Sequence, residues 1–79
     1  MASGEISLSE VWKMLEACLP GHVRKLHTHH YSVRLRDRIY PAFPKGAHGK
    51  ADPSIEKGHV RRLARFFGIM DCAKQHLNV

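Results

Sequence analysis

Eight residues near the middle of the chain, HHYSVRLR at positions 29–36, alternate polar and apolar side chains. Side chains of a β-strand point to opposite faces in turn, so this pattern predicts a strand with one apolar and one polar face. The apolar face would carry Tyr31, Val33 and Leu35, and the polar face His30, Ser32, Arg34 and Arg36. Such a strand requires a sheet with one face in the core and the other in solvent.

We expect one further strand before this one in the sequence and one after it. Residues 22–28, HVRKLHT, favour an edge strand, and residues 38–44, RIYPAFP, resume an apolar strand after a tight reversal at Asp37 and Arg38. Pro41 indicates an edge or a bulge, because proline has no amide hydrogen to donate to a neighbouring strand. Residues 44–54, PKGAHGKADPS, predict a mobile, exposed loop.

The N-terminal part of the chain predicts an amphipathic helix. Ser7 and Glu10 have the spacing of a capping box, with Ile6 and Val11 placed as the hydrophobic staple beside it. Apolar residues then recur at helical spacing until Pro20 and Gly21 end the helix: Leu8, Val11, Trp12, Leu15 and Leu19. Trp12 belongs to this stripe, so we expect it in the core.

A second helix is predicted from near Gly58 to Gly68, where glycine suits a left-handed C-cap. Its apolar side carries Val60, Leu63, Ala64 and Phe67, and its polar side carries Arg61, Arg62 and Arg65. Residues 71–77, DCAKQHL, favour a short third helix that Asp71 caps.

These elements predict an α+β fold of αβββα order, with two helices packed on one face of a three-stranded antiparallel sheet. Residues 1–79 would form a single domain with its core in residues 6–69, and residues 70–79 a short C-terminal extension. The expected core residues are Val11, Trp12, Leu15, Tyr31, Val33, Leu35, Val60, Leu63 and Phe67. A chain of this size buries only about 60% of its extended surface, so we expect no large enclosed cavity.

Net charge points to a polyanionic partner. Thirteen Lys and Arg residues against seven Asp and Glu give a formal charge of +6, which favours nucleic acid over a charge that only aids solubility. Candidate nucleic-acid-binding residues are Lys25, Arg34, Arg36, Arg38, Lys45, Lys50, Arg61, Arg62 and Arg65.

The cysteines and the N-terminus indicate the compartment. Cys18 and Cys72 form no C-x-x-C motif and are too few for a disulfide framework, so we expect two core thiols in a reducing cytoplasm. The chain shows no signal-peptide pattern and no apolar run of membrane-spanning length, so no membrane association is expected. Histidine spacing gives no zinc signature, because His59 and His76 are far from the 27–30 cluster, and we expect no metal or cofactor.

The histidines at positions 27, 29 and 30 allow three interpretations: a nuclease centre, a metal site, or plain polar residues on a solvated strand face. Metal-independent RNA cleavage needs a base for the 2′-hydroxyl proton, and histidine suits this role because its unperturbed pKa is about 6.5. His30 would share the exposed strand face with Ser32 and Arg34, so it is the candidate base. Because side chains alternate along a strand, His27 and His29 would lie on the opposite face from His30. The general acid stays open among His29, Tyr31 and Lys45.

Four segments resemble the HicA family of small bacterial toxins. They are the helix positions Ser9, Val11, Lys13, Leu15 and Glu16, the strand HHYSVRLR, the reversal RDRIYP, and the closing IEKGHVRRLARFFGI. The resemblance covers residues 8–69. The chain departs from the family pattern in two places: HTHH stands where the turn usually supplies a glycine, and the 44–54 loop is longer than usual.

The resemblance implies a double-stranded-RNA-binding-domain-like fold and a toxin of a toxin–antitoxin pair that cleaves mRNA as an endoribonuclease. The family's functional histidine falls on His30, and the implied partner is an acidic HicB-like antitoxin protein. We expect the chain to be a monomer when alone. Two other classes stay open: a non-catalytic RNA- or DNA-binding module of the same fold, and a protein-interaction module that uses a sheet edge.

Overall fold

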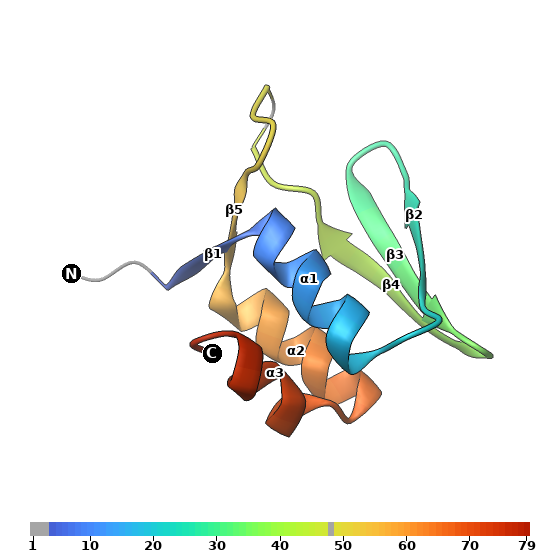
Figure 1. The fold of residues 1–79 in the computed structure, drawn as a ribbon. Helices are drawn as coiled ribbons and strands as arrows, with labels where there is room; N and C mark the ends of the chain where they lie inside the picture. Colours follow the sequence, from blue (N-terminus) through green and yellow to red (C-terminus); the bar gives the residue numbers. More distant parts are fainter. Residues whose placement is uncertain (1–3, 48) are drawn as a thin grey trace.

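The computed structural model describes residues 4–47 and 49–79, which form an α+β fold with three helices among them (Figure 1). The helices are α1 (Leu8–Cys18), α2 (Lys57–Phe67) and α3 (Met70–His76). The strands are β1 (Glu5–Ser7), β2 (Val23–Leu26), β3 (His30–Leu35), β4 (Arg38–Pro44) and β5 (Ser54–Glu56). None of these helices combines the length and the hydropathy that a membrane span requires.

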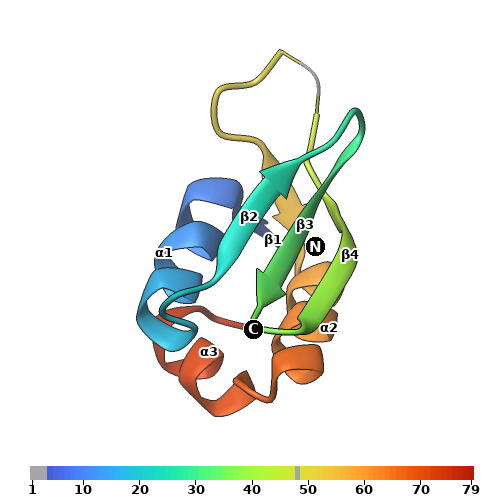
Figure 2. The ribbon, with the colours of Figure 1, turned by 90° about the vertical axis from the view of Figure 1, so that its right-hand side faces the viewer.

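Strands β2, β3 and β4 form the predicted three-stranded antiparallel sheet, with β3 in the centre. The expectation for Pro41 is confirmed on both counts. It lies in an edge strand, and the register between β3 and β4 shifts by one residue between Tyr31 and Val33. Figure 2 views this sheet from its open face, with α1 and α2 behind it.

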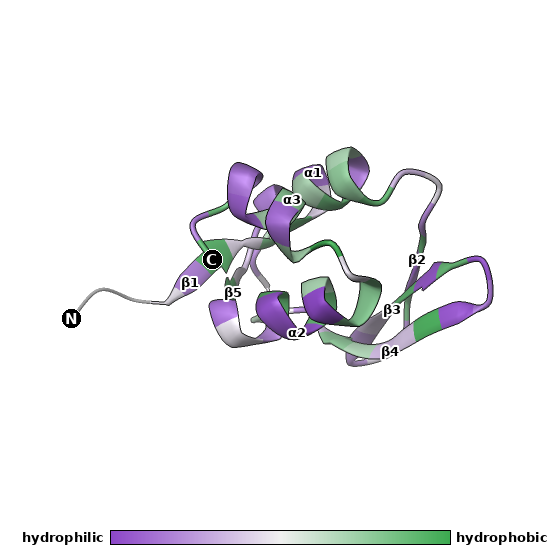
Figure 3. Ribbon diagram, turned by 90° about the horizontal axis from the view of Figure 1, so that it is seen from below, coloured by the Kyte–Doolittle hydropathy of each residue, from purple (hydrophilic) through white to green (hydrophobic). Residues whose placement is uncertain are grey.

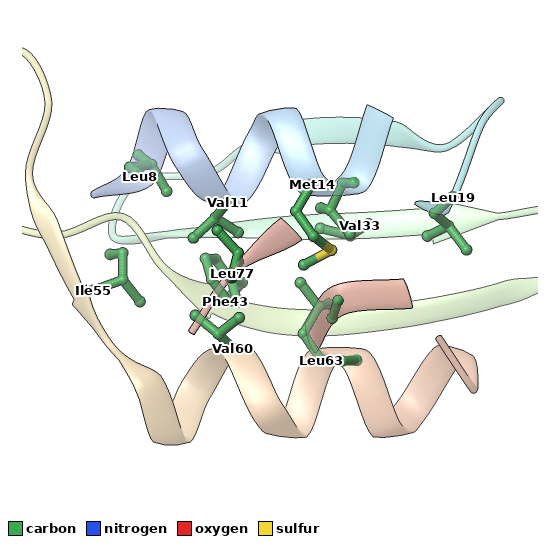
Figure 4. Packing of buried hydrophobic residues seen from close by; sticks show 13 residues of the cluster. Leu8, Val11, Met14, Leu19, Val33, Phe43, Ile55, Val60, Leu63 and Leu77 are labelled. Carbon is green, nitrogen blue, oxygen red and sulfur yellow. The ribbon is translucent and has the colours of Figure 1, made fainter. Parts of the chain in front are cut away.

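The core lies between the other face of the sheet and the helices (Figure 4). Five expected core residues are fully buried: Val11, Leu15, Val33, Val60 and Leu63. The other four are partly buried and pack against the core: Trp12, Tyr31, Leu35 and Phe67. Trp12 contacts the Tyr31 ring edge to face, at 4.9 Å between ring centroids, and so joins α1 to β3.

The prediction that residues 70–79 extend beyond the core is wrong. Ala73 of α3 is fully buried and Leu77, directly after α3, is 7% exposed, so both belong to the same apolar cluster as α1 and α2. The third helix begins at Met70 with Ile69 at the N-cap position, so Asp71 lies in its first turn instead of capping it.

The expectation of free core thiols is also wrong. Cys18, the last residue of α1, and Cys72 in α3 form a disulfide with their Cα atoms 5.7 Å apart. The bond spans 54 residues of sequence. In the chain-entropy description, closing a loop of that length stabilises the folded state by about 4 kcal/mol.

Two short strands that the sequence patterns did not indicate form a second, two-stranded sheet. β1 and β5 pair antiparallel, with Ile6 opposite Ile55, and each strand leads directly into a helix. Ile55 is 2% exposed, so this small sheet extends the core under α1 and α2. The predicted start of α2 near Gly58 and its left-handed cap at Gly68 agree with the structure, in which α2 runs from Lys57 to Phe67.

The first turn of α1 is stabilised by a residue far away in sequence. Ser7 occupies the N-cap position, but within the described residues its side chain makes no capping hydrogen bond, so the predicted capping box is wrong. Asp52 instead accepts hydrogen bonds from the Ser9 amide at 2.8 Å and the Ser9 hydroxyl at 2.7 Å. The Leu8 amide donates to the Pro53 carbonyl at 2.8 Å. The end of the 44–54 segment is therefore bonded to the helix, and Pro53 is buried.

These contacts predict a pH-dependent contribution of Asp52 to stability. The backbone hydrogen bond from Ser9, together with that from its hydroxyl, lowers the pKa of Asp52 below the model-peptide value of 3.8, and the charge of Lys13 acts in the same direction. A lowered folded-state pKa stabilises the protein above the unfolded pKa, and this contribution is lost as pH falls through the folded pKa. Asp52→Asn should therefore unfold at a lower temperature than the parent at pH 6–7, with a gap that narrows below about pH 4.

Thermal unfolding of both proteins between pH 2 and pH 7 measures this gap. Asp37→Asn, which removes an exposed carboxylate in the β3–β4 turn, is the control and should follow the parent more closely. If the difference in unfolding temperature between Asp52→Asn and the parent stays constant over the whole pH range, the charge of the Asp52 carboxylate does not contribute to stability.

Candidate nucleic-acid interface

The open face of the three-stranded sheet holds a shallow groove of about 580 Å³. Alternate residues of the three strands and of the β2–β3 turn line it: Val23, Lys25, His27, His30, Ser32, Arg34, Ile39 and Pro41. These residues alternate with those that face the helices, such as Tyr31 and Val33. The polar face predicted for β3 is therefore the floor of a groove.

The register of the β2–β3 hairpin brings two histidines together. Leu26 pairs with Tyr31, so the next position outward places His27 opposite His30, and the His27 amide donates to the His30 carbonyl at 2.8 Å. Directly opposed residues of antiparallel strands project to the same face. The parity prediction that put His27 on the other face from His30 is wrong, because His27 belongs to the β2 side of the hairpin.

The two imidazoles stack in this arrangement. Their ring centroids are 4.7 Å apart and their planes differ by 20°. The His27 Nε2 atom lies 3.0 Å from the Ser32 hydroxyl oxygen, and either atom can donate according to the histidine tautomer. Both histidines and Ser32 are half-buried. One side of the groove thus holds two stacked imidazoles and a hydroxyl that contacts one of them, that of His27.

None of the three residues considered as the general acid lines this groove among the described residues. His29 is exposed in the turn, and Tyr31 packs against Trp12 on the helix side of the sheet. The Lys45 amine donates to the Thr28 carbonyl at 3.0 Å behind the turn. His27 was missed as the partner of His30; the signal was the H-x-x-H spacing across a two-residue turn.

Two of the predicted nucleic-acid-binding residues lie in the groove with the histidines, Lys25 on β2 and Arg34 on β3. The Arg34 guanidinium donates to the Arg36 carbonyl at 3.3 Å, and Arg36 is exposed in the β3–β4 turn. Arg38 is directed elsewhere, because it donates to the Phe66 carbonyl and lies 4.6 Å over the Phe66 ring.

The other predicted basic residues lie away from the groove. Lys45 and Lys50 line a smaller hollow of about 210 Å³ beside Tyr31 and Leu26. Arg61, Arg62 and Arg65 are on α2, whose buried side contacts the covered face of the sheet. Figure 3 shows the hydrophilic stripe of α2 turned outward, away from the core. The predicted nucleic-acid-binding residues are therefore distributed over several places: two line the groove, two line the smaller hollow and three lie on α2.

One three-residue group with metal-ligating atoms is found among residues 4–47 and 49–79, and it is remote from the histidine groove. It consists of Cys18, Cys72 and His76, where α1 meets α3. The histidines of the groove do not belong to it, so a metal centre at His27 and His30 has no third ligand in the described part of the chain.

Comparison with known proteins gives no relative: no family model, no curated protein and no solved structure matches the chain. The chemistry of the groove therefore has to be interpreted from its own residues and geometry.

Proposed function

We propose that the chain is a metal-independent endoribonuclease that cleaves mRNA in the cytoplasm, a HicA-like toxin with a double-stranded-RNA-binding-domain-like fold. The observation that carries this proposal is the stacked pair of His27 and His30, in contact with Ser32, inside an open groove that also holds Lys25 and Arg34. A base, an acid and two cations within one groove are the groups that RNA cleavage through the 2′-hydroxyl requires.

In the proposed reaction the groove residues have separate roles. His30 removes the proton from a ribose 2′-hydroxyl, and the 2′-oxygen forms a bond to the adjacent phosphorus. The bond from phosphorus to the 5′-oxygen breaks, and His27 donates a proton to that leaving oxygen. The products are a 2′,3′-cyclic phosphate and a 5′-hydroxyl end. Lys25 and Arg34 stabilise the negative charge that develops on the phosphate oxygens.

The shape of the groove favours single-stranded RNA. It is open along the sheet and flanked by Val23 and Ile39, each 51% exposed, which offer apolar surface to unstacked bases. In-line attack by the 2′-oxygen also requires a nucleotide that can leave the A-form geometry. Single strands and loops meet both conditions.

Substitution of the two histidines tests the reaction. His30→Ala and His27→Ala should each slow RNA cleavage by about 10²–10⁴-fold, the usual contribution of one general acid or base. Both side chains are outside the apolar cluster, so the fold should be retained. His29→Ala, at the exposed turn position between them, is the matched control and should cleave at the parental rate.

An RNA in which sulfur replaces the leaving 5′-oxygen separates the two roles. Sulfur leaves without protonation, so this substrate should restore cleavage by His27→Ala but leave His30→Ala slow. Equal rescue of both variants would contradict the assignment of base and acid. A parent protein that binds RNA but never cuts it would leave the non-catalytic RNA-binding module as the function.

Binding of RNA should depend steeply on salt, because the groove cations neutralise phosphates. Each lost contact to a single strand lowers the slope of log affinity against log salt by about 0.7. Lys25→Ala combined with Arg34→Ala should therefore reduce the slope by about 1.4. The comparison is a triple variant of α2, with Arg61→Ala, Arg62→Ala and Arg65→Ala. If it reduces the salt slope more than the groove variant does, the RNA-binding surface lies on α2.

An acidic HicB-like antitoxin would cover the groove. Its carboxylates would pair with Lys25 and Arg34, and apolar side chains would bury Val23 and Ile39. The chain should therefore co-purify with the product of the adjacent reading frame, and Lys25→Glu with Arg34→Glu should prevent this. Co-purification that survives the double charge reversal would place the partner elsewhere.

A further inference from the structure

The point where α1 meets α3 gathers three side chains with soft or borderline metal-ligating atoms. Cys18 is the last residue of α1, and Cys72 and His76 lie one helical turn apart on α3. Residues four apart on a helix share a face, so His76 projects beside Cys72. The two sulfur atoms and a ring nitrogen of His76 all lie within 4.8 Å of one another. Both cysteines are half-buried and His76 is exposed.

The geometry of a tetrahedral zinc site sets the separation that these three atoms need. Zn–S bonds of about 2.3 Å and Zn–N bonds of about 2.0–2.1 Å place neighbouring ligand atoms roughly 3.4–3.8 Å apart. Rotation of the exposed His76 side chain brings its nitrogen into that range, and the two sulfur atoms reach it once the bond between them opens. A Cα separation of 5.7 Å leaves the backbone of both helices in place.

We propose that Cys18, Cys72 and His76 form a redox-controlled binding site for Zn²⁺. The oxidised chain joins α1 to α3 by the disulfide, and the reduced chain joins the same helices through the metal ion. Thiolates and imidazole are ligands that suit zinc, and three protein ligands leave the fourth position to water. In a reducing compartment a cysteine pair more often serves a metal than a disulfide.

The interconversion balances with a dithiol as the reductant. The dithiol supplies two electrons and two protons, the Cys18–Cys72 bond breaks to two thiols, and the reductant becomes a cyclic disulfide. Binding of Zn²⁺ then releases the two thiol protons, because the metal binds thiolates. The proposal does not depend on the RNA-cleaving function, since the groove histidines contribute no ligand to this site.

Co²⁺ tests the site because it occupies zinc sites and reports thiolate ligands by a charge-transfer absorption. The full chain, reduced, then separated from the reductant and kept free of oxygen, should bind one Co²⁺ per chain with this absorption. Zn²⁺ should displace it. The oxidised chain should show no such absorption. The thermal unfolding temperature of the reduced chain should rise when Zn²⁺ is added.

His76→Ala should lower the apparent Co²⁺ affinity of the reduced chain at least tenfold, and Cys72→Ser, which leaves one thiolate, should weaken both the affinity and the thiolate absorption. His59→Ala, on α2, is the matched control and should bind like the parent. Circular dichroism of each reduced variant, with and without metal, separates loss of ligand from loss of fold. The proposal is overturned if the reduced parent binds no Co²⁺ through thiolates, if it binds half an equivalent between two chains, or if His76→Ala binds as tightly as the parent.

Discussion

One apolar layer, between the sheet and the two longer helices, supports the rest of the molecule. Val33 and Phe43 on the covered face of the sheet are fully buried against Val11 and Leu15 of α1 and Leu63 of α2. Burial of each such side chain contributes about 1.5–3 kcal/mol, so this layer provides most of the driving force for folding. The layer covers only one face of the sheet. The opposite face is consequently free to carry polar side chains, and the groove occupies it.

The helices α1 and α2 and the strands β3 and β4 could be predicted, because the residue patterns that produce them lie within short stretches of sequence. The alternation in residues 29–36 corresponds to β3, residues 38–44 to β4, and the apolar stripes to α1 and α2. The missed features depend on residues far apart in sequence. Asp52 reaches Ser9 across 43 residues, and Cys72 reaches Cys18 across 54. Phe43 was not identified as a core residue because its burial depends on how β4 lies against the helices.

The candidate site was predictable in part for the same reason. His30, Ser32 and Arg34 share a face because they alternate on one strand, and that expectation is confirmed. His27 and Lys25 reach the same groove from β2, through a pairing that periodicity along one strand does not describe. The net charge of the sequence does not distinguish one Arg or Lys residue from another. The fold separates the two in the groove from the three on α2, and it engages Arg38 with Phe66.

The two-residue turn between β2 and β3 has a consequence for how this chain can change over evolution. Opposition of His27 and His30 depends on the number of residues between them, not on the identity of Thr28 and His29. A register shift of one residue moves every side chain of a strand to the other face. An insertion or deletion in the turn that shifts this register would therefore separate the two imidazoles, whereas substitutions that keep the register would leave them opposed. Within any lineage that keeps the histidine pair, turn length should be preserved while turn composition drifts.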